Sequence, residues 1–210
     1  TKDSRVEVFR KRPFGWETTV GTEVWWGNDT TRIVHSFGLG SVDSLLLVRD
    51  RSCLRAFPLS RMTYSNRNKI KLHCKSKELS TSTAHHGIAV LGGRIYVTDW
   101  GLKAILVFDR ERLRMDSMEV LPTDTFHLPY APLGITVHRD QLWVTGANGT
   151  FESRSSADGS LIRHYGNIEG HRFVSPGAIH SSGNGFVVVE QAAGSVVQGN
   201  IRYSTINIHP

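Results

Sequence analysis

Short apolar runs separated by glycine-containing turns are the main pattern along this chain. The clearest example runs from Gly87 to Asp109 and reads GIAVLGGRIYVTDWGLKAILVFD. Each apolar run is only long enough for a strand and is bounded by turn residues. The stretch therefore predicts three strands, at 87–91, 94–99 and 104–109, joined by two tight turns.

The same order of strands and turns returns further along the chain. It recurs at 134–154 and more loosely at 177–197, with a weaker copy at 33–57. The middles of the second strands are Glu7, Arg49, Thr98, Thr145 and Val189. Their spacing of about 45 residues is typical of a propeller built from radial antiparallel sheets. We therefore predict an all-β fold, a β-propeller of four-stranded antiparallel blades.

Five units are visible in this single predicted domain. The expected blades span approximately 1–31, 32–83, 84–129, 130–174 and 175–210. Two arrangements fit: a closed five-bladed ring whose two chain ends share one blade, or part of a six-bladed ring. In the second case the chain belongs to a larger chain or complex, since an unclosed ring leaves a strand edge open to a partner.

The second strands are almost continuously apolar, as IYV, LWV and FVVV show. Strands covered on both faces lose the alternation of polar and apolar residues, so Tyr96, Trp143 and Phe186 are expected to pack between blades. Glycines in the turns near 92–93, 100–101 and 148–149 are expected to take positive φ. No G-x-S-x-G nucleophile motif appears, and the strand-rich pattern offers no helix to carry one.

The best repeat also resembles known families. Residues 86–109 look like a repeat of the NHL family, with the first-strand glycine and the strands IYVTD and VFD in register. The stretch is similar to the YWTD repeats of low-density lipoprotein receptor propellers, where Tyr96, Thr98 and Asp99 match and Val97 replaces the tryptophan. This resemblance implies a scaffold, because such receptor propellers are extracellular binding or acid-release modules and NHL propellers bind protein or RNA.

By the same resemblance, carboxylates at Asp99 and Asp50 would join adjacent blades through hydrogen bonds to backbone amides. A charge-assisted bond of this kind contributes about 1.5–3 kcal/mol. The resemblance therefore gives these two carboxylates an architectural role, and the sequence offers no catalytic residue.

A metal-dependent channel enzyme, of the lyase or the lactonase/esterase type, is the alternative to a scaffold. In peptidyl-amidoglycolate lyases, which resemble NHL propellers, a histidine before the first-strand glycine binds zinc, and His86 occupies that place. A catalytic zinc needs about three protein ligands, but the matching places hold Leu133 and Pro176. We therefore predict no cofactor and interpret His86 as a channel residue, with channel zinc or calcium as the alternative.

The net charge is +6, and the positive excess is concentrated in the second unit. Between Arg49 and Lys77 the sequence has nine Lys or Arg residues and one acidic residue, Asp50. In KIKLHCKSK the residues Lys69, Lys71, Lys75 and Lys77 alternate with apolar positions, as on a strand with one wet face. Two interpretations stay open. Lysines protect an outer strand from pairing, or they bind a polyanion such as a sulfated glycan or nucleic acid.

The cysteines and sequons favour an extracellular or secretory location. Cys53 and Cys74 fall on the third and fourth strands of one predicted blade, where a disulfide can form in an oxidising compartment. The sequons Asn28-Asp29-Thr30 and Asn148-Gly149-Thr150 sit in predicted turns. No apolar run is long enough to span a membrane.

Together these features predict a non-enzymatic propeller that binds another macromolecule, a protein or an acidic glycan. The expected binding surfaces are the channel mouth, at His86, Tyr130 and Ser175, and the basic flank of the second blade. Loops at the end of a rigid ring carry recognition because the strands fix their positions.

Overall fold

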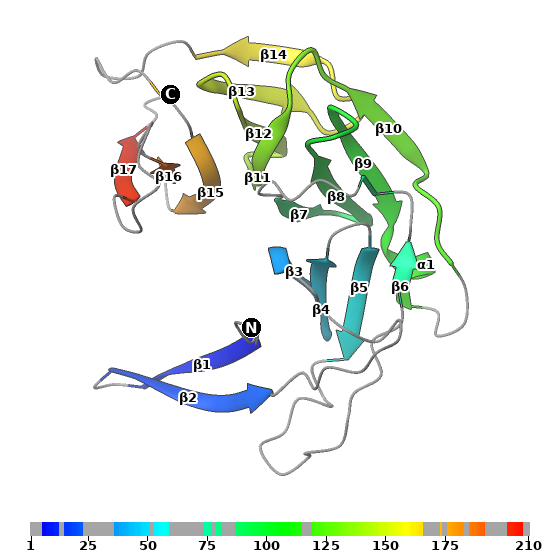
Figure 1. Cartoon of the computed structure of the whole chain (residues 1–210), viewed down its shortest axis with the longest axis vertical. Coiled ribbons are helices and arrows are strands. Elements are labelled where there is room, and N and C mark those ends of the chain that lie inside the picture. Colours follow the sequence, from blue (N-terminus) through cyan, green and yellow to red (C-terminus); the bar gives the residue numbers. More distant parts are fainter. Residues whose placement is uncertain are drawn as a thin grey trace.

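The strands form antiparallel sheets that follow one another around an arc (Figure 1). The computed structural model describes residues 6–12, 15–22, 36–50, 53–58, 74–76, 79–80, 87–114, 119–165, 173, 176–182, 185–191 and 201–207. Within these residues there are three four-stranded sheets, one three-stranded sheet and one two-stranded hairpin. The predicted all-β fold with four-stranded antiparallel blades is confirmed.

Each sheet is a meander in which neighbours in sequence are neighbours in the sheet. The hairpin pairs β1 (Val6–Arg12) with β2 (Gly15–Thr22). The second blade is β3 (Ser36–Val42), β4 (Leu45–Asp50), β5 (Cys53–Pro58) and β6 (Cys74–Ser76). The third blade is β7 (Ile88–Leu91), β8 (Arg94–Asp99), β9 (Ala104–Asp109) and β10 (Asp124–His127). The fourth blade is β11 (Pro132–His138), β12 (Gln141–Gly146), β13 (Thr150–Ser155) and β14 (Leu161–His164), and the fifth is β15 (Pro176–Ser182), β16 (Gly185–Gln191) and β17 (Ile201–Asn207).

The first strands of successive blades lie next to one another along the inside of the arc. Strand β3 contacts β7, β7 contacts β11, and β11 contacts β15. Because each blade begins at the inside and runs outward, β6, β10 and β14 are the outer edges of the four-stranded sheets (Figure 1). This radial order is the arrangement that the repeat predicted.

The hydrophobic core is divided among the spaces between blades. Side chains of the second strand alternate, so Ile95 and Val97 pack with the second blade while Tyr96 packs with the fourth. In the next space Trp143 packs against Phe186, with ring centroids 4.5 Å apart. Burying both faces explains the continuously apolar second strands, and each large side chain contributes roughly 1.5–3 kcal/mol. The predicted inter-blade positions of these three aromatic residues are confirmed.

Neighbouring blades approach so closely that some first-strand positions have room only for glycine. A Cβ on Gly87 would lie 2.5 Å from the backbone nitrogen of Ile135 in the fourth blade. A Cβ on Gly134 would lie 2.4 Å from the carbonyl oxygen of Gly177 in the fifth blade. These glycines are therefore needed for packing between blades.

One turn differs from its prediction. Gly92 and Gly149 have positive φ, at 59° and 74°, but in the β8–β9 turn Lys103 is the residue with positive φ, at 49°. Gly101 serves a different purpose, because a Cβ there would lie 2.6 Å from Ser80 Oγ. The glycine of this turn is required by close packing.

The described residues also include a short helix, α1 (Arg110–Arg114), which follows β9. The Asp109 Oδ1 atom accepts a hydrogen bond from the Arg112 backbone N–H at 3.0 Å. Glu111 lies in the first turn, near the positive end of the helix dipole. Asp is a preferred N-cap residue because its side chain accepts a hydrogen bond from a free backbone N–H of the first turn, and strand periodicity does not detect such a cap.

Candidate functional site

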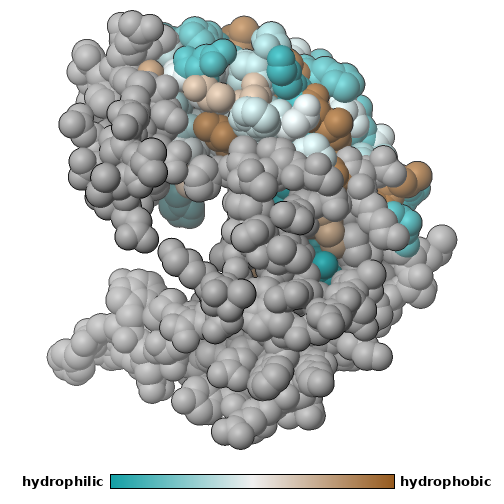
Figure 2. Space-filling model, viewed as in Figure 1, coloured by the Kyte–Doolittle hydropathy of each residue, from teal (hydrophilic) through white to brown (hydrophobic). Residues whose placement is uncertain are grey.

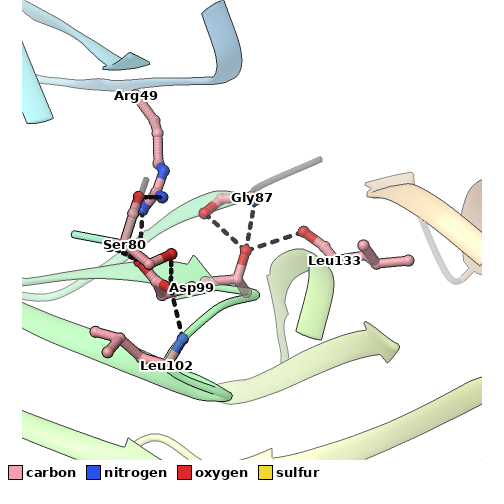
Figure 3. A network of polar contacts seen from close by, with 7 residues as sticks. Arg49, Ser80, Gly87, Asp99, Leu102 and Leu133 are labelled. Carbon is pink, nitrogen blue, oxygen red and sulfur yellow. Dashed lines mark hydrogen bonds and ion pairs between the residues drawn. The ribbon is translucent and has the colours of Figure 1, made fainter. Parts of the chain in front are cut away.

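A buried ionic network connects the second blade to the third. The Arg49 guanidinium on β4 donates a hydrogen bond to Asp99 Oδ2 on β8 at 3.0 Å and another to the Ser80 carbonyl oxygen at 3.1 Å. Both side chains of the ion pair are fully buried. Figure 3 shows these groups pointing toward one another from different parts of the chain.

The Asp99 carboxylate also accepts bonds from the loops on either side of it. Ser80 donates from its backbone N–H at 2.8 Å and from its hydroxyl at 2.5 Å, and Leu102 donates from its backbone N–H at 2.9 Å. Burial raises the pKa of Asp99, but the bonds from Ser80 and Leu102 and the charge of Arg49 outweigh it, so the pKa lies below its ordinary value. The carboxylate is therefore held in its charged form. The architectural role expected for Asp99 is confirmed, while the Asp50 side chain lies outside the described part.

A second kind of inter-blade bond repeats from blade to blade. Thr98 Oγ1 accepts a hydrogen bond from the Gly87 N–H at 2.6 Å and donates one to the Leu133 carbonyl oxygen of the fourth blade at 2.9 Å. Thr145 Oγ1 makes the equivalent bonds, accepting from the Gly134 N–H at 2.9 Å and donating to the Gly177 carbonyl oxygen of the fifth blade at 2.6 Å. Arg49 stands at the same place in the second blade, where it reaches the third.

A third polar cluster stabilises the fourth blade at its outer strands. Tyr130 donates its hydroxyl hydrogen to Glu152 Oε1, and Arg154 Nε donates to the same oxygen at 2.5 Å. His164 Nδ1 lies 3.7 Å from Glu152 Oε2. Burial and the bond to Glu152 raise the pKa of Tyr130. Burial lowers the pKa of Arg154, but the bond to Glu152 and the nearby charge raise it further, so both groups keep their protons.

The chain order gives each blade two distinct ends. We call the end where β8 finishes and β9 begins the Asp99 end, and the end where β8 begins the Arg94 end. Every carboxylate that the structure describes as exposed lies at the Arg94 end: Asp43, Glu111, Glu119, Asp124, Asp140 and Asp158. The two described carboxylates at the Asp99 end, those of Asp99 and Glu152, are buried. Among the described residues, exposed negative charge is therefore confined to the Arg94 end, where the exposed Arg94, Arg112 and Arg139 also lie.

The predicted site residues fall into two groups. His86, Ser175, Lys69, Lys71, Lys77 and Asn28 lie outside the described residues. Tyr130, Lys75, Cys53, Cys74 and Asn148 lie within described segments. Tyr130 is at the Asp99 end, where it is buried against Gly146 and bonded to Glu152. Its binding role and that of His86 and Ser175 stay predictions.

The remaining described residues have clear positions. Lys75 and Cys74 are on β6, the outer strand of the second blade, and Cys53 is buried at the start of the neighbouring β5. Arg55 pairs with Cys74, two residues along β5 from Cys53. Asn148 is exposed in the β12–β13 turn.

Among the described residues no group of three or more His, Cys, Asp or Glu is placed to hold a metal ion. The same part of the chain contains no helix long and apolar enough to cross a membrane.

The sequence reasoning missed the partners of the buried charges. A detectable signal was present, because Arg49 interrupts an apolar second strand that is buried on both faces, and Glu152 and Arg154 are two residues apart on one face of β13. A charged residue in such a strand requires an oppositely charged partner. The identity of the partner depends on which blades adjoin.

Comparison with solved structures supports the fold. The glutaminyl cyclase of Myxococcus xanthus matches with a TM-score of 0.52 at 11% identity, over 73% of this chain and 60% of that one. The RRP9 WD40 repeats match with a TM-score of 0.52 at 15% identity, over 73% and 44%. The Pan2 WD40 domain of Neurospora crassa matches with a TM-score of 0.55 at 11% identity, over 80% and 46%. The chain therefore spans about half the length of these structures. No family model and no curated protein matches the sequence.

These likenesses and the radial antiparallel sheets define the fold as a β-propeller. At these identities the comparisons support the fold alone and do not distinguish the NHL or YWTD class.

Proposed function

We propose that this chain is a binding module that holds another protein against the Asp99 end of its blades. The observation that carries the proposal is the use of buried polar side chains there. Arg49, Asp99, Thr98 and Thr145 each join a strand of one blade to the chain of the next. Such bonds give a rigid frame, and a rigid frame that fixes its loops favours recognition.

Photo-crosslinking can test which end of the frame binds. The outer strand β10 has an exposed residue at each end, His127 at the Asp99 end and Asp124 at the Arg94 end. We would place p-benzoylphenylalanine at either position and irradiate the purified chain with an extracellular protein fraction from the source organism. The proposal expects a discrete protein adduct from position 127 and none from position 124. Equal adducts at both positions, or none, would contradict it.

We also propose that the protein resides outside the cell or in the secretory pathway, with a disulfide between Cys53 and Cys74 and a glycan on Asn148. The two cysteines occupy neighbouring strands, and Asn148 is exposed in a turn. Intact mass of the natively produced protein tests this. If the disulfide is present, reduction increases the mass of the protein by two hydrogen atoms. If the glycan is present, treatment with N-glycosidase lowers the mass. Two free thiols in the untreated protein and an unmodified Asn148 would contradict the proposal.

A further inference from the structure

The β8–β9 turn presents four consecutive exposed residues, Trp100 to Lys103, at the Asp99 end. Trp100 is 41% exposed and Leu102 is 45% exposed. We call Trp100, Leu102 and Lys103 the turn patch. In the space-filling view, hydrophobic residues interrupt the hydrophilic surface of the described blades (Figure 2). Exposed apolar side chains that stand together mark interaction sites more often than single ones.

The blade does not need these apolar side chains to fold. The equivalent β12–β13 turn of the fourth blade consists of Ala147, Asn148 and Gly149, none of which is a large apolar residue. That blade forms the same four-stranded meander. The turn patch is therefore a property of the third blade and calls for an explanation beyond architecture.

The turn is held in one conformation by the buried network beneath it. The Leu102 N–H donates to Asp99 Oδ1 at 2.9 Å, and the Lys103 N–H donates to the Trp100 carbonyl oxygen at 3.3 Å. From the β10 side, the Leu128 N–H donates to the Lys103 carbonyl oxygen at 2.8 Å. Through Asp99 the turn is connected to Arg49 of the second blade. A tryptophan on a fixed backbone loses little entropy on binding, and Trp is enriched among residues that dominate interfaces.

The charge distribution indicates the kind of partner. Lys103 is exposed beside the two apolar side chains, and the exposed carboxylates described for this chain all lie at the other end of the blades. At the Arg94 end the exposed carboxylates are mixed with the exposed Arg94, Arg112 and Arg139, whereas Lys103 stands at the Asp99 end without an exposed carboxylate among the described residues. An acidic segment would therefore meet unopposed positive charge at the Asp99 end. We propose that the turn patch binds an acidic protein segment that inserts an apolar side chain beside Trp100 and Leu102. This inference rests on the proposed binding function and names its surface and partner class.

Fluorescence anisotropy with synthetic peptides tests this proposal. The acidic probe is a fluorescein-labelled peptide of Asp and Glu with one Leu-Phe pair, and the basic probe has Lys in place of every acid. We expect the acidic probe to bind more tightly, with an affinity that falls as salt is added. Trp100→Ala or Leu102→Ala should weaken binding by about tenfold or more, and Lys103→Glu should reverse the preference between the two probes.

Leu121→Ala is the matched control, because Leu121 is 57% exposed at the Arg94 end. This variant should bind the acidic probe like the wild type. Equal binding of the two probes, or equal effects of Trp100→Ala and Leu121→Ala, would overturn the inference. So would light scattering that shows a wild-type dimer dissociated by Trp100→Ala, since the patch would then bind a second copy. If position 127 crosslinks a protein while the acidic probe fails, the binding function stands and only the acidic turn-patch partner is rejected.

Discussion

The guanidinium of Arg49 in the second blade lies 3.0 Å from the carboxylate of Asp99 in the third, and neither side chain reaches solvent. The two residues are far apart in sequence, yet each stands near the end of a second strand. Their contact connects two blades and fixes the turn that carries Trp100. A buried pair of this kind links the stability of the two blades to the shape of their candidate binding end.

Removing one partner of this pair should be costly. We expect Asp99→Ala to lower the free energy of unfolding by about 3–5 kcal/mol, because Arg49 would stay buried without its counter-charge. Urea denaturation measures the effect, and Asp124→Ala on an exposed carboxylate is the control. A loss no larger than that of the control would show that the pair contributes little.

Replacing both partners should be less harmful than replacing one. In the double variant Arg49→Met with Asp99→Leu, no buried charge remains. The Nε atom of Arg49 already lacks a hydrogen-bond partner in the described structure, so its removal costs nothing at that atom. Recovery should be partial, because the Ser80 and Leu102 backbone N–H groups lose their acceptor. A double variant less stable than Asp99→Ala would contradict this account.

The threonine bridges can be tested by near-isosteric replacement. Thr98→Val removes the hydroxyl that joins the Gly87 N–H to the Leu133 carbonyl oxygen, and Thr145→Val does the same one blade later. Each change should cost about 1–3 kcal/mol, since buried polar groups lose partners. Thr98→Ser keeps the hydroxyl and should retain more stability than Thr98→Val in thermal or urea unfolding. Equal stability of the Ser and Val variants would argue against the bridge.

Acid should weaken the contact between the second and third blades partly through Asp99. The folded-state pKa of Asp99 lies below its ordinary value of 3.8. Its stabilising contribution is therefore present above the unfolded-state pKa and is lost as pH falls through the folded-state pKa. We expect the stability difference between the wild type and Asp99→Asn to be constant at neutral pH and to shrink below about pH 4. Free energies of unfolding from neutral pH downward measure it, and a difference that does not shrink would refute the assignment.

The spacing between blades predicts a contrast between two glycines. Gly87→Ala would place a Cβ 2.5 Å from the Ile135 nitrogen, whereas a Cβ on Gly93 meets nothing within 4 Å. We expect Gly87→Ala to destabilise by about 1–3 kcal/mol or more, because backbone atoms of two blades must separate. Gly93→Ala should be close to neutral. Melting temperatures of the two variants provide the comparison, and similar values would mean that the blades are less tightly packed.

The strands of the third blade were predictable from the sequence because their causes are local. The ranges predicted for the second and third strands, 94–99 and 104–109, agree with β8 and β9. The strand around Tyr96 is apolar at successive positions, so both of its faces were expected to be buried. The repeat implied that neighbouring blades would cover them. The α1 helix was missed because a single capped turn carries too few residues to show a helical period.

The sequence by itself determined the strand pattern, the repeat and the inter-blade positions of Tyr96 and Trp143, since these follow from hydrophobic periodicity. Only the tertiary structure decided which polar groups meet, because Arg49 pairs with Asp99 and Thr98 donates to the Leu133 carbonyl oxygen across a boundary between blades. It also decided that Trp100 and Leu102 stay exposed while Tyr130 is buried. Burial at the end of a blade depends on how the adjoining loops pack, and the order of residues along one strand does not contain that information.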